Sequence, residues 1–171
     1  VYLPTCISRM LGGSANGKKN IIDTVASVSA KVGVSFKIPK QVNGLCCGQL
    51  FSSKGYQEAF SYTVNETVER LWHDTQEGKL PVVIDVSSCT YTLQGSRNAL
   101  SAANQLKFDQ MRIIDSIDFV DEYILPKVNN IRKKQRIVLH PVCSLKKMGL
   151  QEKFVKIAKA FADEVVVPFN A

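Results

Sequence analysis

The sequence lacks a membrane-spanning run and the short motifs that identify nucleotide sites and single-loop metal sites. No stretch approaches the roughly 20 apolar residues of a transmembrane helix, and the start does not have the pattern of a signal peptide. The glycine-rich stretch 12–19 lacks the complete G-x4-G-K-[ST] pattern of a phosphate-binding loop, so we interpret it as a flexible crossover loop. The spacing C-x2-C, typical of zinc knuckles and ferredoxin clusters, does not occur either.

The chain has a surplus of positive charge, but this charge is not concentrated in one place. The formal net charge is +7, and tight basic groups are short, such as 132–134 and 146–147. A nucleic-acid surface would show lysine and arginine clustered with aromatic residues, so we expect no nucleic-acid partner. The surplus is typical of a solvated surface; docking to an acidic partner or attraction of an anionic substrate is the alternative.

The five cysteines cannot all pair, and nothing else in the sequence marks a secreted protein. A disulfide framework is therefore not expected, and a reducing, cytoplasmic setting fits better. Thiols in that setting are available as ligands. The chain begins with a valine inside an apolar run, so we expect it to be an excised piece of a longer protein.

Strand-like apolar segments alternate with segments of helical periodicity along the whole chain. Repeated strand–helix–strand units favour parallel pairing and right-handed crossovers. We therefore predict a single α/β domain over 1–171, a layered αβα (Rossmann-like) fold with a mainly parallel sheet. Strands are expected at 1–5, 34–38, 82–86, 112–115, 137–140 and 165–167. Helices are expected around 21–32, from Ser52 or Ser53 to about 77, and at 98–108, 118–131 and 150–161.

All five cysteines follow predicted strands, at the junction where the next helix begins. Carboxyl ends of parallel strands share one edge of a sheet, so Cys6, Cys46, Cys47, Cys89 and Cys143 are expected to meet there. Helix N-termini at that edge would favour thiolates or an anionic cluster. For any single cysteine a small buried apolar side chain is an equally good interpretation. His140 is a further candidate ligand, although a hydrogen-bonded histidine at a strand end explains it as well.

The spacing of the cysteines and the residues around them resemble those of a known domain family. Cys6, then 39 intervening residues, then Cys46-Cys47-Gly48, then Cys89, resembles the cysteine-rich CCG domain. That domain occurs in heterodisulfide reductase B subunits, in glycolate oxidase iron–sulfur subunits and at the C-terminus of FAD-linked D-lactate dehydrogenases. The last group is most similar in the segments YLPTCISRM (2–10), CCGQLFSSKG (46–55), DVSSCT (85–90) and HPVCS (140–144).

The resemblance implies an oxidoreductase. A 4Fe-4S type iron–sulfur cluster would be ligated by Cys6, Cys46, Cys47 and Cys89, with Cys143 in a second half-site. FAD would lie outside this segment, in a flavin domain of the same polypeptide or complex that oxidises D-lactate or another 2-hydroxyacid. Electrons would pass to a quinone or cytochrome, in the cytoplasm or in peripheral association with the inner face of the membrane. Arg9, Lys54 and Lys146 are candidates for neutralising negative charge near the site.

The sequence departs from the family pattern in two places, and these departures affect which function is favoured. Cys89 is followed by Thr90-Tyr91-Thr92, without the C-x2-C that ends the motif in the heterodisulfide reductase branch. A second Cys-Cys-Gly would be expected just after Ala171. A thiol-active, heterodisulfide-reductase-like subunit is therefore the less favoured enzyme interpretation. A docking domain that holds zinc, or no metal, is a third interpretation.

Overall fold

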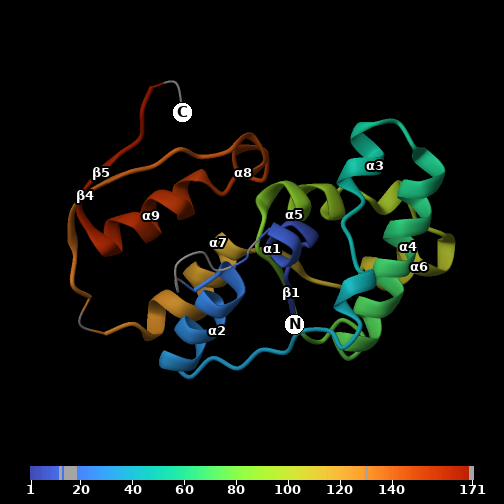
Figure 1. Cartoon of the computed structure of the whole chain (residues 1–171), viewed down its shortest axis with the longest axis horizontal. Coiled ribbons are helices and arrows are strands. Elements are labelled where there is room, and N and C mark those ends of the chain that lie inside the picture. The colour runs from blue at the N-terminus through green and yellow to red at the C-terminus, as the bar shows by residue number, and fades with distance from the viewer. Residues whose placement is uncertain (12, 14–18, 130, 170–171) are drawn as a thin grey trace.

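The structure is a computed structural model that describes residues 1–11, 13, 19–129 and 131–169. It confirms the predicted layered α/β class (Figure 1), although its sheets are small. One sheet has three parallel strands in the order β1-β2-β3, and a separate sheet has two parallel strands, β4 and β5. The strands of the described residues are β1 (Tyr2–Leu3), β2 (Val82–Ile84), β3 (Ile113–Asp115), β4 (Lys134–Val138) and β5 (Ala162–Val166).

The helices of the first half are short except for one. The long helix, α4 (Gln57–Asp74), presents Phe60, Val64, Val68 and Leu71 to the interior at helical spacing. Helices of this half are α1 (Cys6–Leu11), α2 (Ile21–Lys31), η1 (Val42–Gly44), α3 (Gln49–Ser53) and α4 (Gln57–Asp74).

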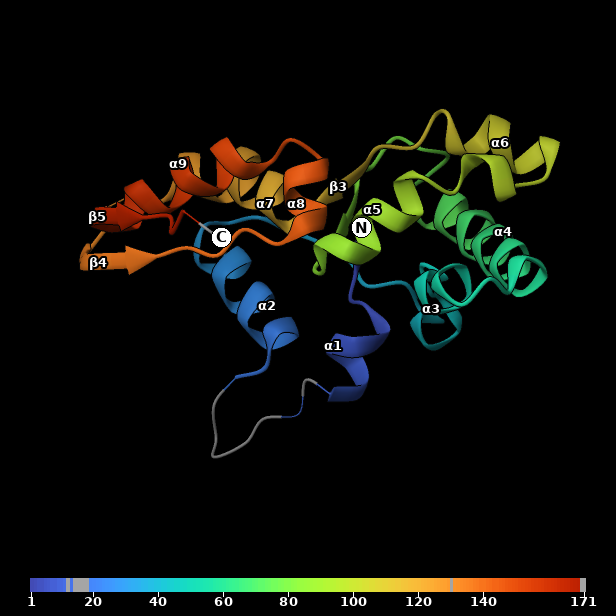
Figure 2. The same cartoon turned by 90° about the horizontal axis from the view of Figure 1, so that it is seen from above.

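The second half alternates short helices with the remaining strands. Its helices are α5 (Ser87–Gln94), η2 (Arg97–Ala99), α6 (Ala102–Phe108), α7 (Ser116–Phe119), η3 (Val120–Ile124), η4 (Leu125–Lys127), α8 (Cys143–Lys147) and α9 (Gln151–Phe161). Figure 2 shows α1 and α2 projecting on one side, while α8 and α9 lie on the other.

Helices cover both faces of the three-stranded sheet. Side chains alternate between the two faces of a strand, and here both faces carry apolar side chains that pack against helices. Leu3 and Ile84 pack with Val64, Val68 and other residues of α4 and α5 in one apolar cluster. Tyr2, Val83 and Ile114 face the opposite way and pack with Phe119 and with residues of α2. Strands buried on both faces explain the near-continuous apolar run at 82–86.

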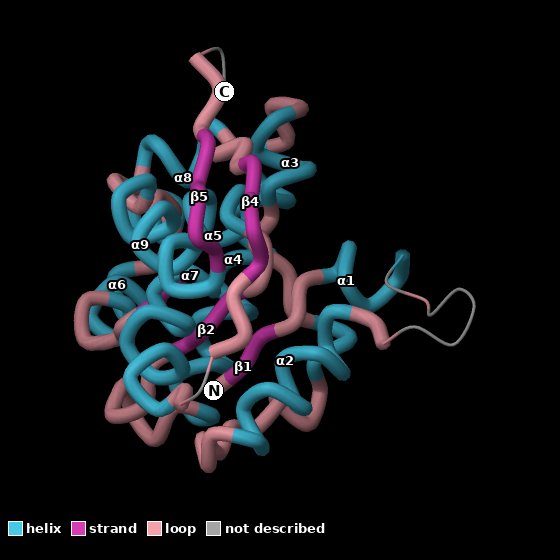
Figure 3. Tube along the Cα trace, turned by 90° about the vertical axis from the view of Figure 1, so that its left-hand side faces the viewer, coloured by secondary structure: helices cyan, strands magenta, loops and turns pink. Residues whose placement is uncertain are grey.

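The two-stranded sheet is more exposed. In β4, Val138 keeps 62% of its surface exposed, and Figure 3 shows β4 and β5 running side by side. Ion pairs join α9 to the segment that follows β3: Lys153 Nζ lies 2.5 Å from Asp118 and Lys156 Nζ lies 2.7 Å from Asp121. These contacts tie the second sheet's helix to the first sheet's layer.

Several predicted elements need correction. The predicted strand 34–38 is irregular, because it makes one backbone bond to β1, from Tyr2 N–H to Lys37 C=O (2.8 Å), instead of a ladder. The helix predicted from Ser52 or Ser53 starts later, at Gln57, because Ser52 and Ser53 end α3 and Gly55 adopts φ +81° in the turn between α3 and α4. The helix predicted at 98–108 is η2 plus α6, and the one at 118–131 is divided into α7, η3 and η4 and ends at Lys127. Positions 12 and 14–18 of the predicted crossover loop lie outside the described residues.

Candidate functional site

The first cysteine lies just beyond the carboxyl end of β1. Pro4 and Thr5 follow the strand, and Cys6 is the first residue of α1. Asp85, directly after β2, holds this turn: its carboxylate accepts from Thr5 N–H (3.0 Å) and from the Tyr2 hydroxyl (2.9 Å). The neighbouring strands β1 and β2 thus position the Cys6 turn together.

The Cys46-Cys47 pair lies in the turn between η1 and α3. Gly48 begins α3 in the left-handed conformation (φ +75°), and its N–H donates to Cys46 Sγ at 3.4 Å. A Cβ on Gly48 would lie 2.6 Å from Cδ2 of Phe60, so the close packing of α4 also requires glycine here. Thr67, in the middle of α4, holds the backbone of Cys46 through its hydroxyl.

Cys89 lies in the first turn of α5, five residues after β2 ends. Its side chain is buried, and its N–H donates to Val86 C=O at 2.9 Å. The next residue, Thr90, donates its hydroxyl to the buried carboxylate of Asp115 at the end of β3 (2.9 Å). Strands β2 and β3 therefore fix the third cysteine segment.

These three segments bring four thiols together. Cys6, Cys46, Cys47 and Cys89 line one small cavity with Leu3, Leu45 and Ile84, and the free space between them is about 10 Å³. Their side chains interact in series, Cys6 with Cys46, Cys46 with Cys47 and Cys47 with Cys89. Residues as far apart as 6 and 89 thus share one place at the carboxyl edge of the sheet.

The thiols differ in acidity because each has different neighbours in this series of interactions. Burial, followed by the charge of Cys46 and a hydrogen bond with it, raises the pKa of Cys6. The hydrogen bond with Cys47, together with burial, raises the pKa of Cys46. The hydrogen bond with Cys46 lowers the pKa of Cys47, but the contact with Cys89 and burial outweigh it and raise that pKa to about 12. Cys89 is the last thiol of the series. The hydrogen bond from Cys47 lowers the pKa of Cys89 against the opposing effect of burial.

The donor set fits an iron–sulfur group in chemistry, since such clusters take thiolate ligands. Backbone N–H groups of Ile7, Gly48 and Gln49 also interact with the sulfurs of Cys6, Cys46 and Cys47 and favour their ionised forms. As packed here, however, the thiols contact one another in sequence. No group of three or more His, Cys, Asp or Glu side chains among the described residues is arranged around a single metal ion. A ligand of several atoms would need the cysteine side chains or turns to move apart.

Cys143 and His140 do not line this cavity. Cys143 is exposed at the start of α8, and His140 is exposed before it. Cys143 instead lines a polar groove of about 400 Å³ between α3, α5 and α8, where Lys147 lies over the ring of Tyr91 (5.5 Å to its centroid). The remaining residues of that groove are Gln49, Ser52, Ser53, Ser88, Thr92 and Ser144.

Of the three basic residues considered for charge neutralisation, only Arg9 lies beside the cysteine turns. Lys54 and Lys146 are exposed at the end of α3 and on α8. Arg9 is half-buried beside the cysteine turns, and its positive charge lowers the pKa of Cys6 as a minor contribution against the overall rise.

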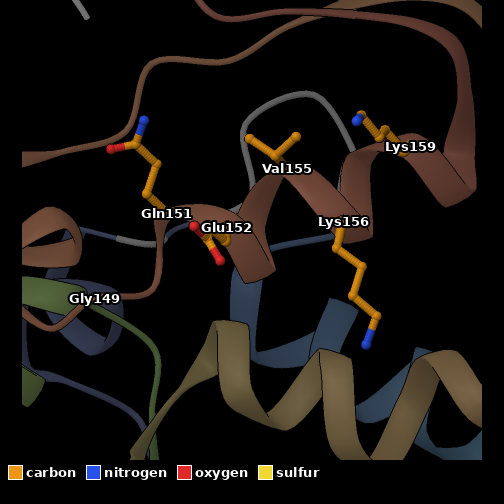
Figure 4. Close-up of a pocket in the computed structure, with 6 residues that line it drawn as sticks. All are labelled: Gly149, Gln151, Glu152, Val155, Lys156 and Lys159. Atoms are coloured by element: carbon orange, nitrogen blue, oxygen red, sulfur yellow. The ribbon is translucent and has the colours of Figure 1, made fainter.

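A broader hollow of about 800 Å³ lies along α9 (Figure 4), away from the cysteine cavity in its lining residues. Lys156 points from α9 toward the neighbouring helix, in keeping with its ion pair to Asp121. The other residues that line it are Gly149, Gln151, Glu152, Val155 and Lys159. Among the described residues no thiol or imidazole lines this hollow, so we assign it no part in the cysteine chemistry.

Sequence reasoning missed two residues that hold the cysteine turns, Thr67 and Asp85. Thr67 is a polar residue within the apolar stripe of α4, and a buried hydroxyl at such a position needs a partner. Asp85 directly follows a buried strand, at the edge where parallel sheets place functional groups. Both signals were present in the sequence.

Comparison with models of known protein families, with curated proteins and with solved structures finds no match. Across the described part of the chain, no helix has the length and hydropathy needed to span a bilayer.

Proposed function

We propose that this chain is the redox module of a flavin-linked 2-hydroxyacid dehydrogenase, in which Cys6, Cys46, Cys47 and Cys89 ligate an iron–sulfur cluster. The observation that carries the proposal is the meeting of these four thiols at the carboxyl ends of β1 and β2. The fold brings together cysteines that are up to 83 residues apart in the sequence, Cys6 and Cys89. The resemblance of their spacing to the CCG domain supports the same assignment.

A bound cluster would supply reversible one-electron transfer. The protein's own part is to hold the thiols, to exclude water and to aim backbone N–H groups at the sulfurs. Leu3, Leu45 and Ile84 form the apolar side of the cavity, and such surroundings tune the reduction potential of a metal centre.

The wider assignment follows the resemblance. D-lactate is the proposed substrate of an FAD-containing flavin domain outside this chain, and a quinone or cytochrome is the proposed acceptor. A cytoplasmic site, with peripheral contact at the inner face of the membrane, is the proposed location. Cys143 and His140 lie outside the four-thiol cavity, so we assign them no ligand role in this cluster.

Anaerobic reconstitution of the chain with iron and sulfide tests the proposal, with iron and acid-labile sulfide content, absorbance and electron paramagnetic resonance as readouts. The wild type should acquire a cluster chromophore, and Cys46→Ser and Cys89→Ser should lose most of it. Cys143→Ser is the matched control, since this exposed thiol lies outside the cavity, and it should retain the cluster. Far-UV circular dichroism would establish that each variant is folded.

Two outcomes would overturn the assignment. Tight zinc binding with no iron chromophore would favour the docking domain. A cluster that Cys143→Ser removes and Cys46→Ser leaves intact would place the centre elsewhere. Dye reduction that depends on D-lactate, measured with the flavin domain present, would separate this function from reduction of a heterodisulfide.

A further inference from the structure

Arg9 joins two cysteine segments that are far apart in the sequence. From α1 its Nη2 donates to Leu45 C=O (2.7 Å), and its Nη1 donates to Val42 C=O in the turn before Cys46. Its Nε donates to Thr5 C=O at 3.4 Å. Among the described residues no carboxylate forms an ion pair with Arg9, so its fixed contacts are mainly backbone carbonyls.

Two of the carbonyls that accept from Arg9 belong to residues next to cysteines. Thr5 immediately precedes Cys6, and Leu45 immediately precedes Cys46. One guanidinium therefore fixes the backbone next to both cysteines, across a gap of 39 residues. The planar fork of arginine can donate in several directions at once, whereas the single ammonium of lysine cannot bridge the same set.

Thr67 holds the same turn from its other side. Its hydroxyl, on α4, contacts both backbone groups of Cys46. The Cys46 turn is thus held between α1 and α4, and the Arg9 contacts fix its backbone to that of the Cys6 turn. Charge neutralisation, the role considered for Arg9 from the sequence, does not need three carbonyl contacts.

We propose that Arg9 is a positioning residue that sets the distance between Cys6 and the Cys46-Cys47 pair and so determines whether the thiols can share one metal centre. The inference rests on the proposed function for its metal-binding consequence, but the positioning itself is a property of the metal-free protein. Residues that orient metal ligands typically change metal affinity by 10- to 100-fold when they are replaced.

The first experiment uses the metal-free protein and needs no cluster. A diazenedicarboxamide oxidant takes two electrons and two protons from a thiol pair and becomes a hydrazine, and the pair becomes a disulfide. Peptide mapping would report the rate of the Cys6–Cys46 disulfide, since these side chains are in contact. Arg9→Lys should slow this disulfide, because a small misplacement of two reacting groups lowers the rate of an intramolecular reaction steeply, by up to roughly 100-fold. Arg97→Lys is the matched control, because Arg97 is exposed and pairs with Asp109.

The second experiment measures iron retained per chain after anaerobic reconstitution and exposure to a competing chelator. Arg9→Lys keeps the charge and loses the fork, so it should retain roughly 10-fold less iron than the wild type and Arg97→Lys. In a Cys6→Ser background, Arg9→Lys should cause no additional loss if Arg9 acts by placing Cys6. A residue that only stabilised the fold would lower iron retention in both backgrounds.

The outcomes separate this inference from the proposed function. If the wild type takes up no cluster, the proposed function fails, while the disulfide rates still test Arg9. If the wild type takes up a cluster and Arg9→Lys matches it in both disulfide rate and iron retention, the positioning role is overturned. Equal unfolding midpoints of Arg9→Lys and Arg97→Lys would confirm that both rates refer to folded protein.

Discussion

The hydroxyl of Thr67 contacts both backbone groups of Cys46. Its Oγ1 accepts from Cys46 N–H at 3.2 Å and donates to Cys46 C=O at 2.9 Å. Thr67 is fully buried on α4, so no water replaces these bonds if the hydroxyl is removed. The relationship ties the cysteine turn to the longest helix of the described chain.

Replacing Thr67 by valine should destabilise the protein by about 2 kcal/mol, because the buried polar groups of Cys46 lose their partner while the volume is preserved. Urea denaturation measures the change. Thr63→Val is the matched control on the same helix: the Thr63 hydroxyl donates to Ala59 C=O, one turn earlier, and its loss should cost less than about 1 kcal/mol. Equal losses in the two variants would contradict the role of Thr67.

Gly48→Ala should cost more than Gly55→Ala. Both glycines have φ between +75° and +81°, so both substitutions carry a left-handed backbone cost of roughly 1–2 kcal/mol. Only at Gly48 does the added Cβ meet a neighbour, with Phe60 Cδ2 at 2.6 Å, while Gly55 has nothing within 4 Å. The overpacked ring should add roughly 1–3 kcal/mol. Thermal and urea unfolding of the two variants would measure the difference, which should vanish if the turn can move away from α4.

The stability of the metal-free protein should fall at alkaline pH, in part because of Tyr2. Burial, followed by the charge of Asp85 and the hydrogen bond to it, raises the pKa of Tyr2 far above its ordinary value of 10.0. The folded state then keeps a proton that the unfolded state loses. The stabilisation is therefore complete below pH 10 and is lost above it, at a rate of at most about 1.4 kcal/mol per pH unit.

Tyr2→Phe removes this titration. Urea midpoints of the wild type and Tyr2→Phe, measured from pH 8 to pH 11, should converge as the pH rises, because only the wild type loses the contribution of Tyr2. A constant difference between the two proteins over this range would show that Tyr2 ionises as freely in the folded state as in the unfolded chain.

The five thiols should react with iodoacetamide in the order of their exposure. Cys143 is exposed, Cys6 and Cys46 are partly exposed, and Cys47 and Cys89 are buried. Although the pKa of Cys89 is lowered, reagent reaches it only through local opening, so its modification should be at least 10-fold slower than that of Cys143. Peptide mapping with time gives the rates, and denatured protein, in which all five should react alike, is the control. Modification of Cys89 as fast as Cys143 would contradict the buried cavity.

Much of the architecture was predictable from local pattern. The apolar run at 82–86 and the helical spacing of Val64, Val68 and Leu71 indicated β2 and α4, because burial demands apolar residues at the period of each element. The segment 34–38 has an equally strand-like composition, but a strand also needs a paired ladder, and that depends on where β1 runs. Composition could not supply this information.

The sequence by itself determined the alternation of strands and helices and the placement of cysteines after predicted strands, since both follow from periodicity and order along the chain. Only the tertiary structure decided that the thiols of Cys6, Cys46, Cys47 and Cys89 meet while Cys143 lies in a separate groove. It also decided that Arg9 and Thr67 hold the Cys46 turn. These contacts join residues more than 20 positions apart, and their geometry depends on how the helices pack on the sheet, which no local pattern encodes.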